Sequence, residues 1–247
     1  YGFAYEQLRH STADLFVVLG IAHSSSCWPE PPPLVSLTRL DFDTPLGRCE
    51  TDQEFVNRLV EGYATAGGDP TALFRDELVH AQEHSLEFQM LFLQHLHGHR
   101  PFRVVPVLMG SLHEFYPFPV MLGSRVGLGP FVTALSEAIG QYPGEVCVVA
   151  GADLSHVGPR FGDPQPVGPE RVREVEEGDR TALAELAESA AGWFRHFAAD
   201  RNARNVCSVS NLYLLRALAP ESELMLLRHE VAFDPDQTVS FAAAALR

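Results

Sequence analysis

The chain has 247 residues, of which 46% are hydrophobic and 20% are charged, so it can bury a sizeable core as one large α/β domain. Its formal net charge is −14, and all 18 basic residues are arginines. The absence of lysine excludes a PLP Schiff base and a P-loop lysine, and the acidic balance argues against a nucleic-acid partner.

The cysteine and hydropathy patterns bear on the cellular compartment. The four cysteines lie far apart and form no CxxC pair: Cys27, Cys49, Cys147 and Cys207. This spacing is typical of reduced thiols and not of a disulfide framework or a structural zinc site. No run reaches the ~20 apolar residues of a membrane span, and no signal peptide is evident. We therefore expect a cytoplasmic protein without a membrane partner.

The predicted elements alternate along the chain. Apolar, β-branched runs that end at or next to a glycine predict buried strands at residues 15–20, 103–110 and 146–150. Helical patterns occupy residues 52–66, 83–96, 131–141, 170–197 (with a break) and 211–218. The small apolar tail 241–246 predicts a packed strand or a helical turn. This alternation favours a single α/β domain over residues 1–247, with a mostly parallel central sheet and helices on both faces.

The segment after the third predicted strand carries the first candidate site residues. Asp153 and His156 lie three positions apart, just beyond the carboxyl end of that strand. Ligands bind at this edge of open α/β sheets, so the pair is placed for reaction chemistry or for a metal ion. The alternative is an aspartate that caps the next helix and a histidine that lies nearby without a function.

Other candidates follow the same pattern. His23 comes after the first predicted strand, where a hydrogen-bonded turn residue is the alternative to a ligand. Glu83 and His84 open a predicted helix, where such residues also satisfy free backbone N–H groups. Cys207 precedes the helix predicted at 211–218, and a thiol there is nucleophilic or a soft metal ligand unless it is merely buried.

The order of these motifs resembles that of one family. The motifs are LGIAH at 19–23, DTPLG at 43–47, EHSLE at 83–87, VVPVLMG at 104–110, DLSHVG at 153–158 and Cys207. Together they make nearly the whole chain similar to the Memo family, whose bacterial members are called AmmeMemoRadiSam system protein B. The resemblance implies a fold like that of the class III extradiol dioxygenases of the LigB type, with a His/Asp/Cys pocket at the carboxyl edge of the sheet.

The resemblance also implies roles for single residues. In the family, iron or copper is held by a histidine of an N-terminal PHAGY element, the first histidine of a GPxHH turn and a late cysteine. By position, His23 and Cys207 correspond to the second and third ligands, and Asp153 and His156 to the pocket pair. Glu83 and His84 would then line the pocket wall or orient its ligands.

The chain departs from the family pattern in three places. It lacks the PHAGY segment, because residues 1–5 align with the helix that follows it. The GPxHH turn keeps one histidine, and the CGxxP run keeps only its cysteine.

Two functions therefore remain open. One is a Memo-like protein whose pocket binds redox-active iron or copper, with His156 as an acid or base tuned by Asp153 and with an unestablished reaction. The other is a non-catalytic binding or scaffold protein with a depleted metal site on a dioxygenase-like fold. We expect neither NAD nor PLP as cofactor. A radical-SAM protein of the same system is the partner that the analogy implies, and the small-molecule substrate is unknown.

Overall fold

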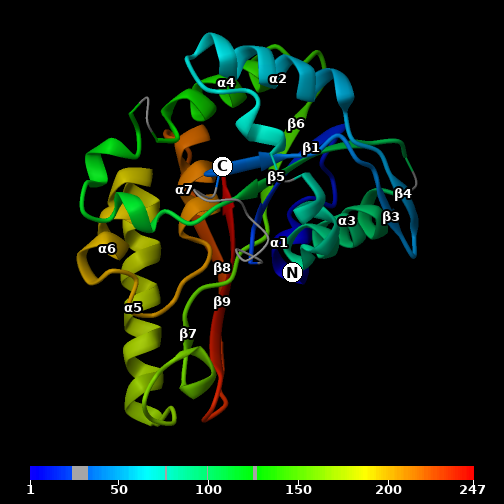
Figure 1. Cartoon of the computed structure of the whole chain (residues 1–247). Helices are drawn as coiled ribbons and strands as arrows, with labels where there is room; N and C mark the ends of the chain where they lie inside the picture. Colours follow the sequence, from blue (N-terminus) through cyan, green and yellow to red (C-terminus); the bar gives the residue numbers. More distant parts are fainter. Residues whose placement is uncertain (24–32, 76, 99, 125–126) are drawn as a thin grey trace.

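The structure is a computed structural model, which describes residues 1–23, 33–75, 77–98, 100–124 and 127–247. A four-stranded sheet lies at its centre, in the order β2-β5-β1-β6 (Figure 1). Its strands are β1 (Leu15–Ile21), β2 (Val35–Leu37), β5 (Arg103–Met109) and β6 (Val146–Ala150). Strand β1 is parallel to β5 and β6, whereas β2 is antiparallel to β5. The three apolar runs thus form the three parallel strands, as predicted, but β6 lies at an edge of the sheet and is half-buried where a buried strand was expected.

Strand β1 separates two apolar cores, because successive side chains of a strand point to opposite faces. Leu15, Val17 and Leu19 belong to the larger core. The helices of that core are α2 (Gln53–Thr65), α4 (Gly129–Gly140), α5 (Pro169–Glu188), α6 (Ala190–Asp200) and α7 (Val209–Leu218). Phe16 and Val18 point into the second core. That core is covered by α1 (Gly2–Glu6) and α3 (His84–His97). The prediction of helices on both faces is confirmed.

A second sheet of three antiparallel strands lies beside α5 (Figure 1). It comprises β7 (His156–Val157), β8 (Leu224–Ala232) and β9 (Thr238–Leu246), in the order β7-β9-β8. The predicted apolar tail is thus the end of a strand. The sequence does not indicate β8, because Arg228 and Glu230 interrupt its apolar residues on an exposed side of the hairpin.

The predicted break in the helical stretch 170–197 lies at Ser189. Helix α5 (Pro169–Glu188) begins with a proline, which is favoured in the first helical turn because no N–H is needed there. Ser189 is extended, at φ −169°, and its side chain accepts a 2.9 Å hydrogen bond from the Gly192 N–H at the start of α6. The serine therefore ends one helix and caps the next.

Shorter elements connect these layers. They are the hairpin β3 (Phe42–Thr44) and β4 (Gly47–Cys49), and the 3₁₀ helices η2 (Ala72–Phe74), η3 (Glu77–Gln82), η4 (His113–Phe115), η5 (Pro119–Met121) and η6 (Pro159–Phe161). Within the described part of the chain, no helix combines the length and the apolar character that a membrane crossing requires.

Candidate functional site

A cavity of about 370 Å³ lies beyond the carboxyl ends of β1 and β6. His23, His84, Asp153 and Cys207 all line it. A second cavity, of about 230 Å³, shares Asp153 with the first and extends between β6 and β9. The strand ends therefore bring four of the six predicted site residues to one hollow, as expected for this edge of a parallel sheet.

Glu83 fixes the position of His23. The backbone N–H of His23 donates to Glu83 Oε1 at 2.7 Å, and its ring Nδ1 lies 3.0 Å from Glu83 Oε2. Ser85, two residues further on, accepts from the Ile21 N–H and donates to the Ile21 carbonyl, each at 3.0 Å. The start of α3 is thereby joined to the end of β1. The carboxylate of Glu83 makes no capping bond to α3, so the capping interpretation of this residue is wrong.

His84 completes this side of the cavity. Its ring stacks on that of His23, with centroids 4.7 Å apart and an interplanar angle of 25°. The ligand atoms of His23, Glu83 and His84 all lie within 4.8 Å of one another. Because Nδ1 of His23 is engaged by Glu83, Nε2 is the ring nitrogen that would bind a metal ion.

Asp153, His156 and Cys207 form a second cluster. The Cys207 thiol donates to Asp153 Oδ1 at 2.7 Å, and His156 Nε2 lies 3.2 Å from Asp153 Oδ2. Nδ1 of His156 lies 3.0 Å from the carbonyl of Leu154. Asp153 does not cap a helix, since the chain continues into β7, so the capping interpretation of this residue is wrong.

Burial and charge oppose each other in this cluster. Burial alone would raise the pKa of Asp153, but hydrogen bonds from His156 and Cys207 outweigh it and lower the pKa. Burial would likewise lower the pKa of His156, yet the contact with Asp153 raises it. For Cys207, burial and the negative charge of Asp153 act together and raise the thiol pKa. The cluster therefore favours an ionic Asp–His pair beside a neutral thiol.

The sequence analysis missed several polar residues near the site, and Ser208 and Asn211 are two of them. Ser208 accepts a 3.0 Å hydrogen bond from the Asp153 N–H, and its position next to Cys207 was the available signal. Asn211, on α7, donates to the Gly151 carbonyl at 2.7 Å. Gly151 itself has no room for a side chain, because an added Cβ would lie 2.5 Å from the Ser85 carbonyl oxygen.

The structure thus divides the predicted residues into two clusters. The two expected metal ligands, His23 and Cys207, line the same cavity but belong to different clusters. Cys27 lies outside the described residues.

Several proteins of one named family are similar to this chain in sequence. A MEMO1 family protein of Methanococcoides burtonii is 31% identical over 64% of this chain and half of its own length. One from Aquifex aeolicus is 28% identical over 68% of this chain and 38% of its own length, so the matched segments span half or less of these relatives. The MEMO1 family protein PF1638 of Pyrococcus furiosus is 25% identical over 95% of this chain and 76% of its own. Residues 1–245 match the family described as Memo-like protein, and the chain belongs to that family.

Proposed function

We propose that the larger cavity is a metal-binding pocket in which His23, Asp153 and Cys207 hold iron or copper. The observation that carries this proposal is the convergence of an imidazole, a carboxylate and a thiol, from three distant segments, on one hollow at the sheet edge. Imidazole and carboxylate suit iron, and a thiolate biases a site toward copper(I) or thiolate-ligated iron. The bond between Glu83 and His23 Nδ1 supports it, because metal-binding histidines usually engage their other nitrogen in this way.

His156 is the candidate acid or base of this pocket. Its hydrogen bond to Asp153 keeps a proton on Nε2, close to the ligands. A bound iron or copper ion would supply one-electron chemistry at this position. That this pocket carries out a reaction on a small molecule is likewise a proposal.

Metal binding is tested on the reduced, metal-free chain. Anaerobic competition titrations with Fe(II) and Cu(I) should give one ion per chain, and His23→Ala and Cys207→Ala should each lower the affinity by about 10-fold or more. His95→Ala on an exposed part of α3 and Cys147→Ala on β6 are matched controls and should not change it. Substoichiometric metal that is indifferent to both site substitutions would exclude this proposal.

The second candidate is a binding protein without turnover on the same fold. The smaller cavity favours it, because it extends the site with aliphatic side chains such as Leu183, Leu186 and Leu212. Oxygen uptake by the metal-loaded protein with a panel of catechols separates the two candidates. Uptake that His156→Ala abolishes supports an enzyme, whereas uptake no faster than the blank supports a binding protein.

Partner and compartment are proposals by analogy. A radical-SAM protein of the same system is the proposed partner, and co-purification from the source cells tests it. The free thiols of Cys49, Cys147 and Cys207 support a reducing compartment such as the cytoplasm.

A further inference from the structure

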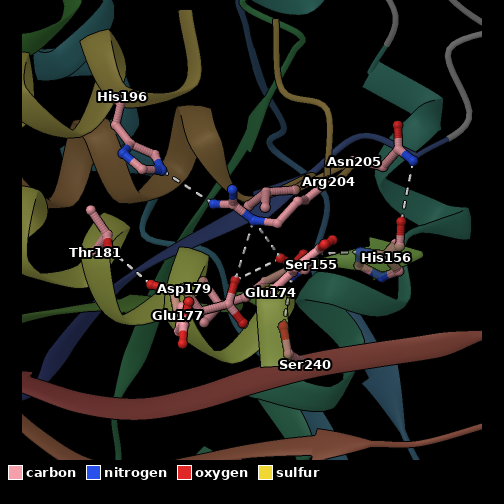
Figure 2. A network of polar contacts seen from close by, with 12 residues as sticks. Ser155, His156, Glu174, Glu177, Asp179, Thr181, His196, Arg204, Asn205 and Ser240 are labelled. Atoms are coloured by element: carbon pink, nitrogen blue, oxygen red, sulfur yellow. Dashed lines mark hydrogen bonds and ion pairs between the residues drawn. The ribbon is translucent and has the colours of Figure 1, made fainter. Parts of the chain in front are cut away.

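A buried ionic network includes Ser155, which stands between Asp153 and His156 in the sequence (Figure 2). Its centre is Asp179 on α5, which is 1% exposed. Asp179 Oδ1 accepts from the Ser155 hydroxyl at 2.6 Å, and Oδ2 lies 3.0 Å from Nε2 of His229 on β8. Arg204 donates from Nε to Ser155 Oγ at 3.1 Å and lies 3.9 Å from the same carboxylate. The serine hydroxyl therefore joins the carboxylate to the guanidinium.

This network connects the two chain segments that form the second cluster, the one with Asp153 and His156 and the one that leads to Cys207. Ser155 stands between Asp153 and His156, and Arg204 is three residues before Cys207. The His156 N–H donates to the Arg204 carbonyl at 2.8 Å. The side chain of Asn205 donates to the His156 carbonyl at 3.2 Å (Figure 2). Both segments are thus fastened to each other and to α5.

The segment before Cys207 has a demanding backbone. Arg201, Asn202 and Asn205 have positive φ angles of 56°, 57° and 50°, which are uncommon for residues with a side chain. Asn202 stabilises the turn with two hydrogen bonds to Val206: its side-chain amide donates to the Val206 carbonyl at 2.8 Å, and its Oδ1 accepts from the Val206 N–H at 2.9 Å. Such conformations persist only where the surroundings hold them, and Arg204 lies within this turn.

Helix α5 is shaped to receive Arg204. Gly178 lies inside the helix, where glycine lowers stability relative to alanine. A Cβ at this position would lie 2.6 Å from the Arg204 guanidinium carbon. Other described partners of the guanidinium are His196, 3.2 Å from Nη2, Asp200, 3.7 Å from Nη1, and the Phe197 ring, whose centroid lies 5.8 Å from its carbon. Gly178 therefore leaves room for the Arg204 guanidinium, and the next residue, Asp179, supplies a carboxylate beside it.

We infer that Asp179 is a positioning residue, which acts through Ser155 and Arg204 to hold Cys207 against Asp153 in the candidate metal pocket. The relevance to metal rests on the proposed function, but the positioning itself does not. If Asp179 only neutralised Arg204, its removal would change stability alone. Removing both charges would then restore that stability, because replacing both members of a buried ion pair often leaves the free energy of unfolding nearly unchanged. A positioning carboxylate matters for the Cys207–Asp153 contact even when stability is restored.

Three variants separate these roles. Asp179→Asn removes the charge and leaves Arg204 with Asp200 as its described carboxylate partner. Asp179→Asn/Arg204→Met removes both charges and should regain stability over the single variant. Glu177→Gln, on an exposed turn of the same helix, is the matched control.

The first readout needs no metal. The rate at which iodoacetamide alkylates Cys207 at a single pH is followed by peptide-resolved mass spectrometry. In the metal-free protein we expect alkylation about 10-fold faster in the single and the double variant, because each loosens the contact that buries the thiol, and an unchanged rate in Glu177→Gln. Rates within about 2-fold of wild type in both Asp179 variants would overturn the inference.

The second readout uses Co(II) alone as the probe, through its thiolate-to-metal absorption. We expect affinity to fall by about 10-fold or more in both Asp179 variants, although the double variant unfolds at a higher temperature than the single one. Affinity that returns with stability in the double variant would overturn the inference. If the wild type binds neither Co(II) nor the Fe(II) and Cu(I) of the competition titrations while alkylation responds as expected, the positioning role stands and the proposed metal site fails.

Discussion

Glu83→Gln isolates the effect of one buried carboxylate on the tautomer of His23. In the wild type, Oε1 accepts the His23 backbone N–H and Oε2 faces ring Nδ1. The new amide oxygen must keep the backbone bond, so the amide NH₂ must face Nδ1. Two donors cannot face each other, and Nδ1 must become the acceptor. The ring proton then moves to Nε2, which blocks the nitrogen that would bind a metal ion.

The size of the effect follows from these two contacts. A hydrogen bond to a charged group stabilises by roughly 1.5–3 kcal/mol, and a neutral one by roughly 0.5–1.5 kcal/mol. Both contacts survive in neutral form, and His23 is 36% exposed, so we expect a loss of about 1–2 kcal/mol in the free energy of unfolding. The affinity for the metal ion should also fall, by about 10- to 100-fold, which corresponds to roughly 1.4–2.8 kcal/mol of binding free energy.

Two measurements check this reasoning. The ¹⁵N shifts of the His23 ring in metal-free protein report the tautomer, and competition titration reports the Cu(I) affinity. Glu87→Gln, on the exposed face of the same helix, should change neither. A ring that keeps its proton on Nδ1 in Glu83→Gln would refute the tautomer argument. An inverted tautomer with unchanged metal affinity would refute the role of His23 as a ligand.

Three further perturbations have defined outcomes. The Asp153–His156 pair has an aspartate pKa below its ordinary 3.8 and a histidine pKa above its ordinary 6.5. The aspartate contribution is lost as pH falls through its lowered folded pKa, and the histidine contribution is lost as pH rises through its raised folded pKa. The difference in Tm between wild type and Asp153→Asn should therefore be largest between about pH 4 and 6.5, and a difference independent of pH would contradict this coupling. Gly178→Ala should destabilise despite the better helix propensity of alanine, because its Cβ would meet the Arg204 guanidinium; a chemical-denaturation midpoint above wild type would show that the arginine moves away at little cost. Trp193→Phe should lower the free energy of unfolding by roughly 2–4 kcal/mol, since it leaves a cavity and removes the 2.9 Å bond from Nε1 to the Val209 carbonyl; a loss under about 1 kcal/mol would mean that the core closes around the smaller ring.

Much of the fold can be predicted from local patterns. The runs of β1, β5 and β6 are rich in apolar and β-branched residues, with Arg103 as the polar exception, so each run predicts a strand without reference to the others. The location of Asp153 and His156 beyond β6 follows from the same pattern, because a parallel sheet brings its carboxyl ends to one edge. The break at Ser189 is equally local, since the cap and the N–H that it satisfies are three residues apart.

The partners of the polar groups depend on the tertiary structure. Glu83 at the start of a helix fits a local capping role in the sequence, yet its carboxylate binds His23, sixty positions earlier. Asp179 resembles any carboxylate of a charged helix until α5 is placed beside Ser155 and Arg204. The hydrophobic pattern determines which faces of the helices and strands are buried. These buried faces determine how the central sheet forms and at which of its edges the site lies. Which carboxylate meets which imidazole, thiol or guanidinium is decided where distant loops converge, because a hydrogen bond needs a geometry that residue spacing does not contain.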